Sequence, residues 1–194
     1  MGSVLAVAAS ARRNGNSDTL LEKALGPVRE AGHTVETIIP YRLSITPCRS
    51  CHGCWETGRC VVDDEMQELY VKFCEADYLA VAAPVYFTNV PGHLKVLIDR
   101  FQCFWARTYR LGEPPEPRRR GIFLCVGGMD REAFYSCSLR VVKTWFSTLN
   151  VKCAVDRFYP GVDQKGAVDE REDYLEDARQ AGRELISVSP EDQG

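Results

Sequence analysis

Four cysteines within thirteen residues form the densest group of reactive side chains in the sequence. They are Cys48, Cys51, Cys54 and Cys60, in the spacing Cys-x2-Cys-x2-Cys-x5-Cys. Four thiolates on one short segment suit a compact [4Fe–4S] cluster, because each iron needs a ligand. Structural zinc more often uses two well-separated Cys-x2-Cys pairs. Residues 47–62 are therefore a candidate cluster loop, with a zinc site and free, reactive thiols as the alternatives.

A second group of polar residues follows the first apolar run of the chain. Residues 4–9 have the length and composition of a strand buried on both faces, and residues 17–31 repeat apolar side chains at helical spacing. The loop between them, Ser10 to Ser17, brings backbone N–H groups, two hydroxyls, Arg12 and a helix N-terminus to one place. These groups together favour a phosphate. The alternative is an ordinary turn with an Asn-Gly bend. The loop lacks Gly-x-Gly-x-x-Gly, which argues against a dinucleotide site.

A third candidate site is the loop from Pro84 to Asn89, which follows the apolar strand at residues 78–83. It carries a proline, two aromatic residues and an asparagine, and therefore offers flat apolar surface and backbone amides. Such a loop suits a planar heteroaromatic ring, and we interpret it as a flavin loop. The alternative for Tyr86 and Phe87 is plain core packing. Gly127-Gly128, after the strand at residues 122–126, is a further loop of close approach at the same kind of strand end.

Five apolar strands alternate with helical segments, which predicts a parallel three-layer α/β domain. The expected strands are residues 4–9, 33–39, 78–83, 122–126 and 151–155. The expected helices after the first are one beyond the cysteine loop, then residues 92–104, 133–149 and 168–186.

Local signals refine these boundaries. Asn16 or Ser17 is the expected N-cap of the first helix, and Asp63 or Asp64 that of the second, with Gln67 placed for a capping-box contact to Asp64. Residues 105–120, which include Glu-Pro-Pro-Glu-Pro and three arginines, are expected to form an exposed excursion. The tail after Ser187 is expected to be loose.

Composition limits the class of protein. The 194 residues are 45% hydrophobic and 26% charged, which fits one well-cored domain spanning residues 1–194. A net charge of -3 gives no electrostatic case for nucleic acid. No apolar run approaches the ~20 residues of a membrane helix, and no signal segment precedes the first strand. The nine cysteines are an odd number, and five of them are scattered through apolar segments, which argues against a disulfide framework. We therefore expect a cytoplasmic protein.

With these loops in view, the sequence resembles the flavodoxin-like NADPH-dependent FMN reductase superfamily, and in particular its iron–sulfur flavoprotein branch. Ser10 to Ser17 is similar to the family's Ser-Pro-Arg-x-x-Gly-Asn-Ser phosphate loop, with Ala11 in place of proline. Pro84-Val-Tyr-Phe-x-Asn-Val and the following Gly92-x-Leu-Lys95-x-x-Ile-Asp99-Arg100 are similar to its isoalloxazine loop and next helix. The cysteine loop resembles the cluster motif of the iron–sulfur flavoproteins.

This resemblance implies a flavodoxin-like fold with strand order 2-1-3-4-5, FMN bound at the switch point, and a homodimer or homotetramer. It implies that the FMN phosphate is held by Ser10, Arg12, Asn14, Asn16 and Ser17. It also implies that the ring is lined by Pro84, Val85, Tyr86, Phe87, Thr88 and Asn89, with Gly127 and Gly128 on the other side.

The predicted function is that of an FMN-dependent oxidoreductase, in which the cofactor carries the chemistry. With a cluster, a ferredoxin-like protein would exchange single electrons with it. Without one, NAD(P)H would be the donor and a quinone, a free flavin or another small molecule the acceptor. A non-enzymatic flavodoxin-type electron carrier and a thiol redox sensor remain alternatives, although flavodoxins are usually strongly acidic. Hydride transfer to flavin needs no acid or base, so no catalytic residue is predicted.

Overall fold

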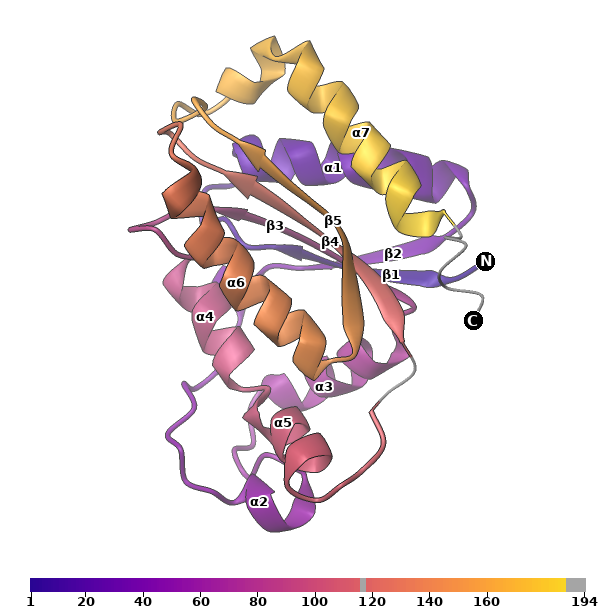
Figure 1. The fold of residues 1–194 in the computed structure, drawn as a ribbon, viewed down its shortest axis with the longest axis vertical. Helices are drawn as coiled ribbons and strands as arrows, with labels where there is room; N and C mark the ends of the chain where they lie inside the picture. Colours follow the sequence, from indigo (N-terminus) through magenta and orange to yellow (C-terminus); the bar gives the residue numbers. More distant parts are fainter. Residues whose placement is uncertain (116–117, 188–194) are drawn as a thin grey trace.

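A parallel sheet of five strands in the order β2-β1-β3-β4-β5 forms the centre of the protein. The computed structural model describes residues 1–115 and 118–187. Figure 1 shows the sheet crossed by helices on both faces. The fold class and strand order expected from the sequence are thus confirmed. The strands are β1 (Ser3–Ala8), β2 (Thr34–Ile38), β3 (Tyr78–Pro84), β4 (Arg119–Val126) and β5 (Val151–Tyr159).

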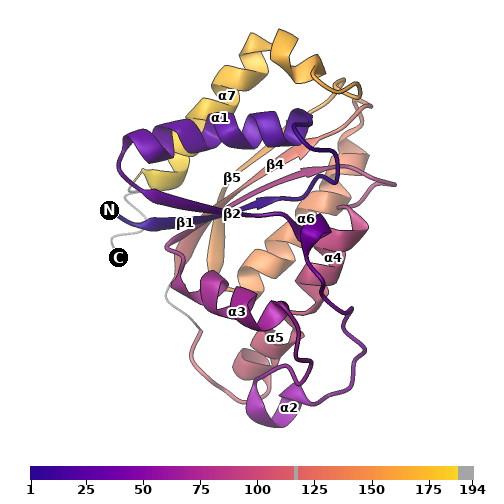
Figure 2. The same cartoon turned by 180° about the vertical axis from the view of Figure 1, so that it is seen from behind.

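Helices α1 and α7 cover one face of the sheet, and α3, α4 and α6 cover the other (Figures 1 and 2). The short helices α2 and α5 lie together below this second layer in Figure 1. Helix α2 is part of the cysteine loop, and α5 packs against it. The helices are α1 (Asn16–Glu30), η1 (Pro40–Arg42), α2 (Cys54–Thr57), α3 (Met66–Glu75), α4 (Gly92–Asp99), α5 (Gln102–Tyr109), α6 (Glu132–Thr148), η2 (Ala167–Glu170) and α7 (Glu172–Ile186). No helix in the described ranges has both the length and the hydrophobicity of a membrane span.

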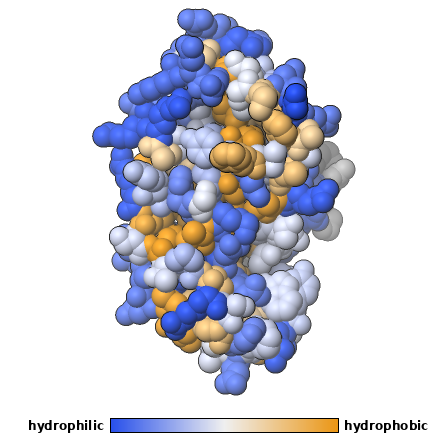
Figure 3. Space-filling model, turned by 90° about the vertical axis from the view of Figure 1, so that its left-hand side faces the viewer, coloured by the Kyte–Doolittle hydropathy of each residue, from blue (hydrophilic) through white to orange (hydrophobic). Residues whose placement is uncertain are grey.

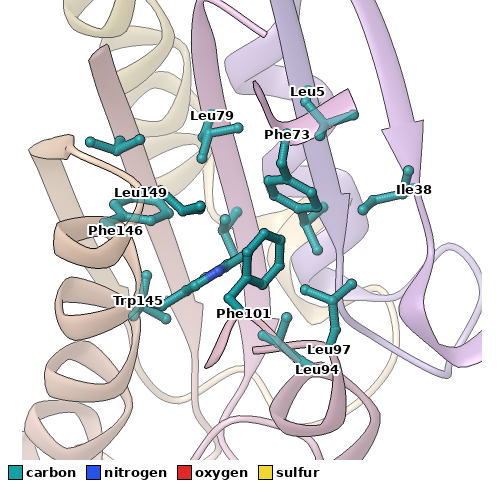
Figure 4. Packing of buried hydrophobic residues seen from close by; sticks show 14 of the residues in the cluster. Leu5, Ile38, Phe73, Leu79, Leu94, Leu97, Phe101, Trp145, Phe146 and Leu149 are labelled. Carbon is teal, nitrogen blue, oxygen red and sulfur yellow. The ribbon is translucent and has the colours of Figure 1, made fainter. Parts of the chain in front are cut away.

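The apolar strands separate two hydrophobic cores, because successive side chains of a strand point to opposite faces. In β1, Leu5 and Val7 join the core beneath α3, α4 and α6, whereas Val4 and Ala6 join the core beneath α1 and α7. Figure 4 shows part of the first of these cores, in which the rings of Phe73, Phe101 and Trp145 lie against one another over the sheet. Both faces are therefore covered over the central strands, as a parallel sheet requires, whereas the edge strand β2 is largely exposed.

Two helices on the other face approach each other unusually closely. A Cβ atom on Gly182 of α7 would lie 1.9 Å from the carbonyl oxygen of Ala24 in α1. Only glycine fits at this crossing. The contact fixes α7 against the helix whose N-terminus faces the candidate phosphate loop.

The structure differs from the expected excursion over residues 105–120 at both ends. The helix expected over 92–104 is broken at Arg100 and Phe101, and its second part, α5, continues to Tyr109. Arg119 begins β4 and is 9% exposed, because its guanidinium donates to Ala76 O at 3.0 Å and Leu149 O at 2.9 Å, at the ends of α3 and α6. Residues 116–117 of the excursion, and the tail after Ser187, lie outside the described residues.

Two predicted helix caps are wrong. Gly15 is the N-cap of α1 and makes no side-chain cap. Gln67 does not reach back to Asp64; its side-chain amide donates to Val62 O at 2.6 Å and Cys60 O at 3.2 Å. The N-cap of α3 is Glu65, although the Asp64 carboxylate still accepts from Met66 N, in the first turn of that helix, at 3.1 Å. The Asn16 side chain bonds to the distant residues Val162 and Gln164 instead of capping α1, a contact that local sequence does not encode.

Candidate functional site

The loops after β1, β3 and β4 meet at one edge of the sheet, because the carboxyl ends of parallel strands lie together. Between them is a small hollow of about 60 Å³. Its polar side is the loop between β1 and α1. Its far side is the predicted flavin loop after β3, residues 84–89, which we call the ring loop. The lining residues are Ser10, Arg12, Gly15, Asn16, Ser17, Pro84, Val85, Tyr86, Val126, Gly128, Val162 and Asp163.

A larger hollow of about 530 Å³ adjoins the first, and its lining is mainly apolar. It is lined by Val85, Tyr86, Phe87, Thr88, Gly127, Gly128, Met129, Phe134, Phe158 and Asp163. The two hollows share Val85, Tyr86, Gly128 and Asp163. Figure 3 looks at the side toward which the ring loop projects, and hydrophobic side chains reach the surface there in several patches. A small polar compartment thus continues into a wide apolar one.

The polar compartment is shaped by the turn before α1. The Ser10 hydroxyl accepts from Arg12 N at 3.1 Å and donates to Arg12 O at 3.2 Å, which closes a tight turn. Asn14 has the left-handed φ of 50°. Ser17 is 3% exposed and lies in the first turn of α1, where the unpaired N–H groups and the helix dipole favour an anion. The structure therefore brings four of the predicted phosphate residues, Ser10, Arg12, Asn16 and Ser17, to one compartment, whereas Asn14 is not among its lining residues.

The side chain of Asn16 binds other groups than expected, although the residue lines the polar hollow. Its amide nitrogen donates to Val162 O and Gln164 O at 2.8 Å each. Its amide oxygen accepts from Gly166 N at 3.0 Å and Val168 N at 3.4 Å. An asparagine side chain has two donors and two acceptor positions, so all four are used within the protein. The Asn16 side chain holds the segment between β5 and α7 and has no hydrogen bond left to offer a ligand.

Sequence reasoning missed that segment, residues 160–168, although Val162 and Asp163 line the polar hollow. Arg12 also reaches it, because the guanidinium donates to Asp163 O at 3.1 Å. The available signal was a polar stretch with two glycines, Gly161 and Gly166, both with positive φ. It lies a few residues beyond the strand predicted over 151–155, which in the structure continues to Tyr159. The segment after β5 is therefore a fourth loop at the carboxyl end of the sheet, and it closes the site.

The ring loop after β3 is a two-residue hairpin turn. Tyr86 and Asn89 exchange backbone hydrogen bonds of 2.9 and 3.0 Å, and Phe87 and Thr88 between them have φ of 49° and 64°. Such turns need positive φ at both central positions, which usually selects asparagine and glycine. The Tyr86 side chain is 46% exposed and Phe87 is fully exposed. Core packing is therefore excluded as the role of these two rings.

The cysteine loop has a fixed half and an exposed half. Cys54 and Cys60 are half-buried against the core, whereas Cys48 and Cys51 are exposed. The loop's far end is held by α5, since Arg107 donates to Gly58 O at 2.8 Å and the Arg110 guanidinium lies 4.2 Å from the centre of the Trp55 ring.

The four thiols are neighbours without forming a ready-made metal site. Burial is the main cause that raises the pKa of the Cys54 thiol, and the charges of Cys60, Cys48 and Cys51 raise it further, so each of these three lies within electrostatic reach of Cys54. Among the described residues, no three metal-binding side chains lie close enough to hold an ion. Thiolates repel one another until a metal neutralises them. The donor set, four sulfurs on one surface segment, fits an iron–sulfur cluster once the exposed half turns inward.

Comparisons with known proteins identify the family of this chain. Residues 3–155 match the family described as NADPH-dependent FMN reductase. The chain is 33% identical over 125 residues to an iron–sulfur flavoprotein of Methanosarcina thermophila, an alignment that covers 64% of this chain and 63% of that protein. It is 35% identical over 109 residues to one from Methanocaldococcus jannaschii, covering 56% and 54%. The chain thus spans less than two thirds of the length of either relative.

Solved structures share the fold. An NAD(P)H:quinone oxidoreductase from Methanothermobacter marburgensis superposes with a TM-score of 0.74 at 24% identity, covering 97% of this chain and 98% of that one. An FMN-dependent NADH-azoreductase from Bacillus anthracis, solved in complex with FMN, gives a TM-score of 0.73 at 18% identity, covering 96% and 100%. At these identities the likeness shows the fold alone.

The family match extends over most of the chain, from β1 into β5, and includes the polar loop, the ring loop and the cysteine loop. The predicted resemblance, including that to the iron–sulfur flavoproteins, is confirmed. The chain belongs to the NADPH-dependent FMN reductase family.

Proposed function

We propose that this protein is an FMN-dependent oxidoreductase whose flavin lies across the two connected hollows. The observation that carries the proposal is the shared lining, Val85, Tyr86, Gly128 and Asp163, which joins a polar compartment at a helix N-terminus to a wide apolar one. FMN has the matching form, a phosphate at one end and a planar ring at the other. Family membership supports the same cofactor.

Each compartment has its own residues in this proposal. The phosphate is held by Ser10, Arg12, Asn14 and Ser17, and by the backbone N–H rather than the side chain of Asn16. The ring lies against Pro84, Val85, Tyr86, Phe87, Thr88 and Asn89, with Gly127 and Gly128 on the opposite side. Glycine at 127 leaves room for the Phe158 ring, which a Cβ atom there would approach within 2.9 Å.

The protein's part in the reaction is to bind and orient. Bound FMN would supply the redox chemistry, taking a hydride from a nicotinamide and passing electrons to an acceptor. The apolar walls around Val85 and Phe158 exclude water from the ring, and the tight turn at Phe87 and Thr88 fixes the loop beside it. No residue of the site has to donate or accept a proton for this step.

We further propose that Cys48, Cys51, Cys54 and Cys60 hold a [4Fe–4S] cluster. The donor set and the iron–sulfur flavoprotein relatives support this. Such a cluster would exchange single electrons with a ferredoxin-like partner. The thiols of Cys54 and Cys60 are seated against the core, and those of Cys48 and Cys51 are free to complete the set.

A second candidate function is an NAD(P)H-dependent reductase of quinones or free flavins with no cluster. The lack of a preformed three-ligand group among the described residues favours it. A carrier or a thiol sensor has no such specific support. In either case we propose a cytoplasmic homodimer or homotetramer. The odd number of cysteines argues against a disulfide framework, as in a reducing compartment, and the exposed ring loop leaves surface for a second subunit.

One preparation distinguishes these candidates. The protein is purified without oxygen and analysed for iron, acid-labile sulfide and flavin, before and after NADPH is added. FMN with about four irons and four sulfides per chain supports the cluster-bearing oxidoreductase. FMN that NADPH bleaches, without iron or sulfide, supports the cluster-free reductase. Absence of flavin after incubation with FMN would contradict both.

A further inference from the structure

Arg100 is a buried charge outside the flavin compartments. It directly follows α4, the helix that leaves the ring loop, and it is 1% exposed. A guanidinium keeps its charge in a protein interior, so its burial is tolerated only with well-placed acceptors. The acceptors therefore show what Arg100 does.

Those acceptors belong to the segments that enter and leave the cysteine loop, residues 44–47 and 61–64, which we call its two stems. Arg100 makes a two-pronged ion pair with Asp64, with Nη1–Oδ2 and Nη2–Oδ1 distances of 2.6 and 3.0 Å. Nη1 also donates to Thr46 O at 2.7 Å, two residues before the first cysteine. Nη2 lies 3.5 Å from Val62 O, two residues after the last. One side chain thus joins the segment that enters the loop to the segment that leaves it.

Asp64 strengthens the same junction. Its Oδ2 atom accepts from Thr46 N at 2.8 Å, and its Oδ1 atom accepts from Met66 N at 3.1 Å. The carbonyl of Arg100 is itself fixed by the Tyr70 hydroxyl at 2.8 Å. Both the backbone carbonyl and the guanidinium of Arg100 are therefore held in place.

Arg100 also touches one of the cysteines. Its Nη2 atom lies 3.5 Å from Cys60 Sγ, within the range of a hydrogen bond to sulfur. A charged donor at a ligand sulfur withdraws electron density from it, and hydrogen bonds of this kind raise the reduction potential of an iron–sulfur cluster.

We propose that Arg100 is a positioning residue for the cysteine loop: it closes the two stems and donates to Cys60, which stabilises the bound cluster and raises its potential. The proposal rests on the cluster proposed above. It assigns Arg100, which follows the helix after the ring loop, to the cysteine site rather than to the flavin site.

The test compares Arg100→Lys with Arg107→Lys in anaerobically prepared holoprotein. Lysine keeps the charge but cannot form the fork that reaches both stems. Arg107 anchors the far end of the loop through Gly58 O, so Arg107→Lys shows how much a general loosening of the loop contributes, and we expect it to have a smaller effect than Arg100→Lys. We expect Arg100→Lys to retain FMN. It should lose iron to a chelator at least about tenfold faster than wild type, which is the usual effect of removing a side chain that supports a metal ligand. Its cluster should also have a lower reduction potential in a redox titration. A wild-type rate of iron loss together with a wild-type reduction potential in Arg100→Lys would overturn the proposal.

Iron-free protein provides the separate readout. Hydrogen exchange of residues 44–62 should be faster in Arg100→Lys than in wild type, whether or not iron binds. If wild type takes up no iron, the cluster assignment fails, and this exchange alone decides the stem-joining role; unchanged exchange would contradict it. If Arg100→Lys does not fold, the Asp64→Asn variant is used in its place, because asparagine keeps the shape of the side chain while weakening the pair with Arg100. The same faster exchange is expected of it.

Discussion

The side-chain amide of Asn16 donates to the carbonyl oxygens of Val162 and Gln164, 146 and 148 residues further along the chain, at 2.8 Å each. A residue that the family motif assigns to the phosphate therefore binds the protein itself. Through this contact the loop before α1 and the segment after β5 become one wall of the polar hollow. Asn16 lines the hollow, and its side chain fixes residues 162–168 beside it.

Replacing Asn16 by alanine should therefore lower stability as well as flavin affinity. Four backbone groups lose their partner, and we expect a loss of about 1–3 kcal/mol in the free energy of unfolding. Urea denaturation of the flavin-free protein measures it. Gln164→Ala is the matched control, because Gln164 contributes only its backbone carbonyl and should leave stability unchanged. Equal stabilities for Asn16→Ala and wild type would show that the contact is unimportant.

Two glycines in packed helices should respond to alanine in opposite directions. Gly182→Ala places a methyl group 1.9 Å from Ala24 O and should destabilise the protein by about 1–3 kcal/mol. Gly92, the first residue of α4, has nothing within 4 Å of an added Cβ atom. Gly92→Ala should therefore stabilise the protein by up to about 0.5–1 kcal/mol. Urea midpoints of the two variants check the pair, and a stabilising Gly182→Ala would refute the close packing of α1 on α7.

Thr88 should be strained in the ring loop. Its φ of 64° is unfavourable for a β-branched residue, whereas glycine adopts this conformation freely. We expect Thr88→Gly to raise the free energy of unfolding by up to about 1 kcal/mol. Thr144→Gly in α6, where φ is helical, should lower it by about 1 kcal/mol. A destabilised Thr88→Gly would mean that the side chain makes a stabilising contact that outweighs the strain.

Asp156 should contribute stability that depends on pH. Burial alone would raise the pKa of its carboxyl, but hydrogen bonds from Tyr135 and Lys143 outweigh burial and lower it. The folded pKa therefore lies below the unfolded value of about 3.9. The contribution is fully present above that value and is lost as the pH falls through the folded pKa.

The Asp156→Asn variant isolates this effect. At pH 7 it should be less stable than wild type by about 1 kcal/mol, since the pair with Lys143 is partly exposed. The difference should shrink as the pH is lowered below 4, because the wild-type carboxyl is then protonated as well. Urea midpoints of both proteins across this range provide the measurement, and a difference independent of pH would contradict the assignment.

The sheet and the positions of the loops at its carboxyl end could be predicted from the sequence because their signals are local and redundant. Continuous apolar runs such as Val4 to Ala9 specify strands buried on both faces, and the chirality of crossovers restricts the strand order. Tyr86 and Phe87 follow a strand end beside Pro84, so their exposure was predictable as well.

What could not be predicted depends on contacts between distant segments. The role of the Asn16 side chain needs the position of residues 162–168, and the break at Arg100 needs Asp64, which lies 36 residues earlier. Arg119 lies beside exposed prolines and arginines in the sequence, yet it enters the core to bind helix ends. A charged residue that is satisfied by remote carbonyls has no local signature.

The most direct test of the flavin site is a comparison of FMN and riboflavin binding to flavin-free protein, with Ser17→Ala as the variant and Ser136→Ala on α6 as control. Ser17 lines the polar hollow, and Ser136 lies on the exposed side of α6. We predict that wild type binds FMN more tightly than riboflavin, and that Ser17→Ala weakens FMN binding about tenfold while leaving riboflavin binding unchanged. Equal affinities of wild type for FMN and riboflavin, or unaltered FMN binding in Ser17→Ala, would contradict a phosphate site at the N-terminus of α1.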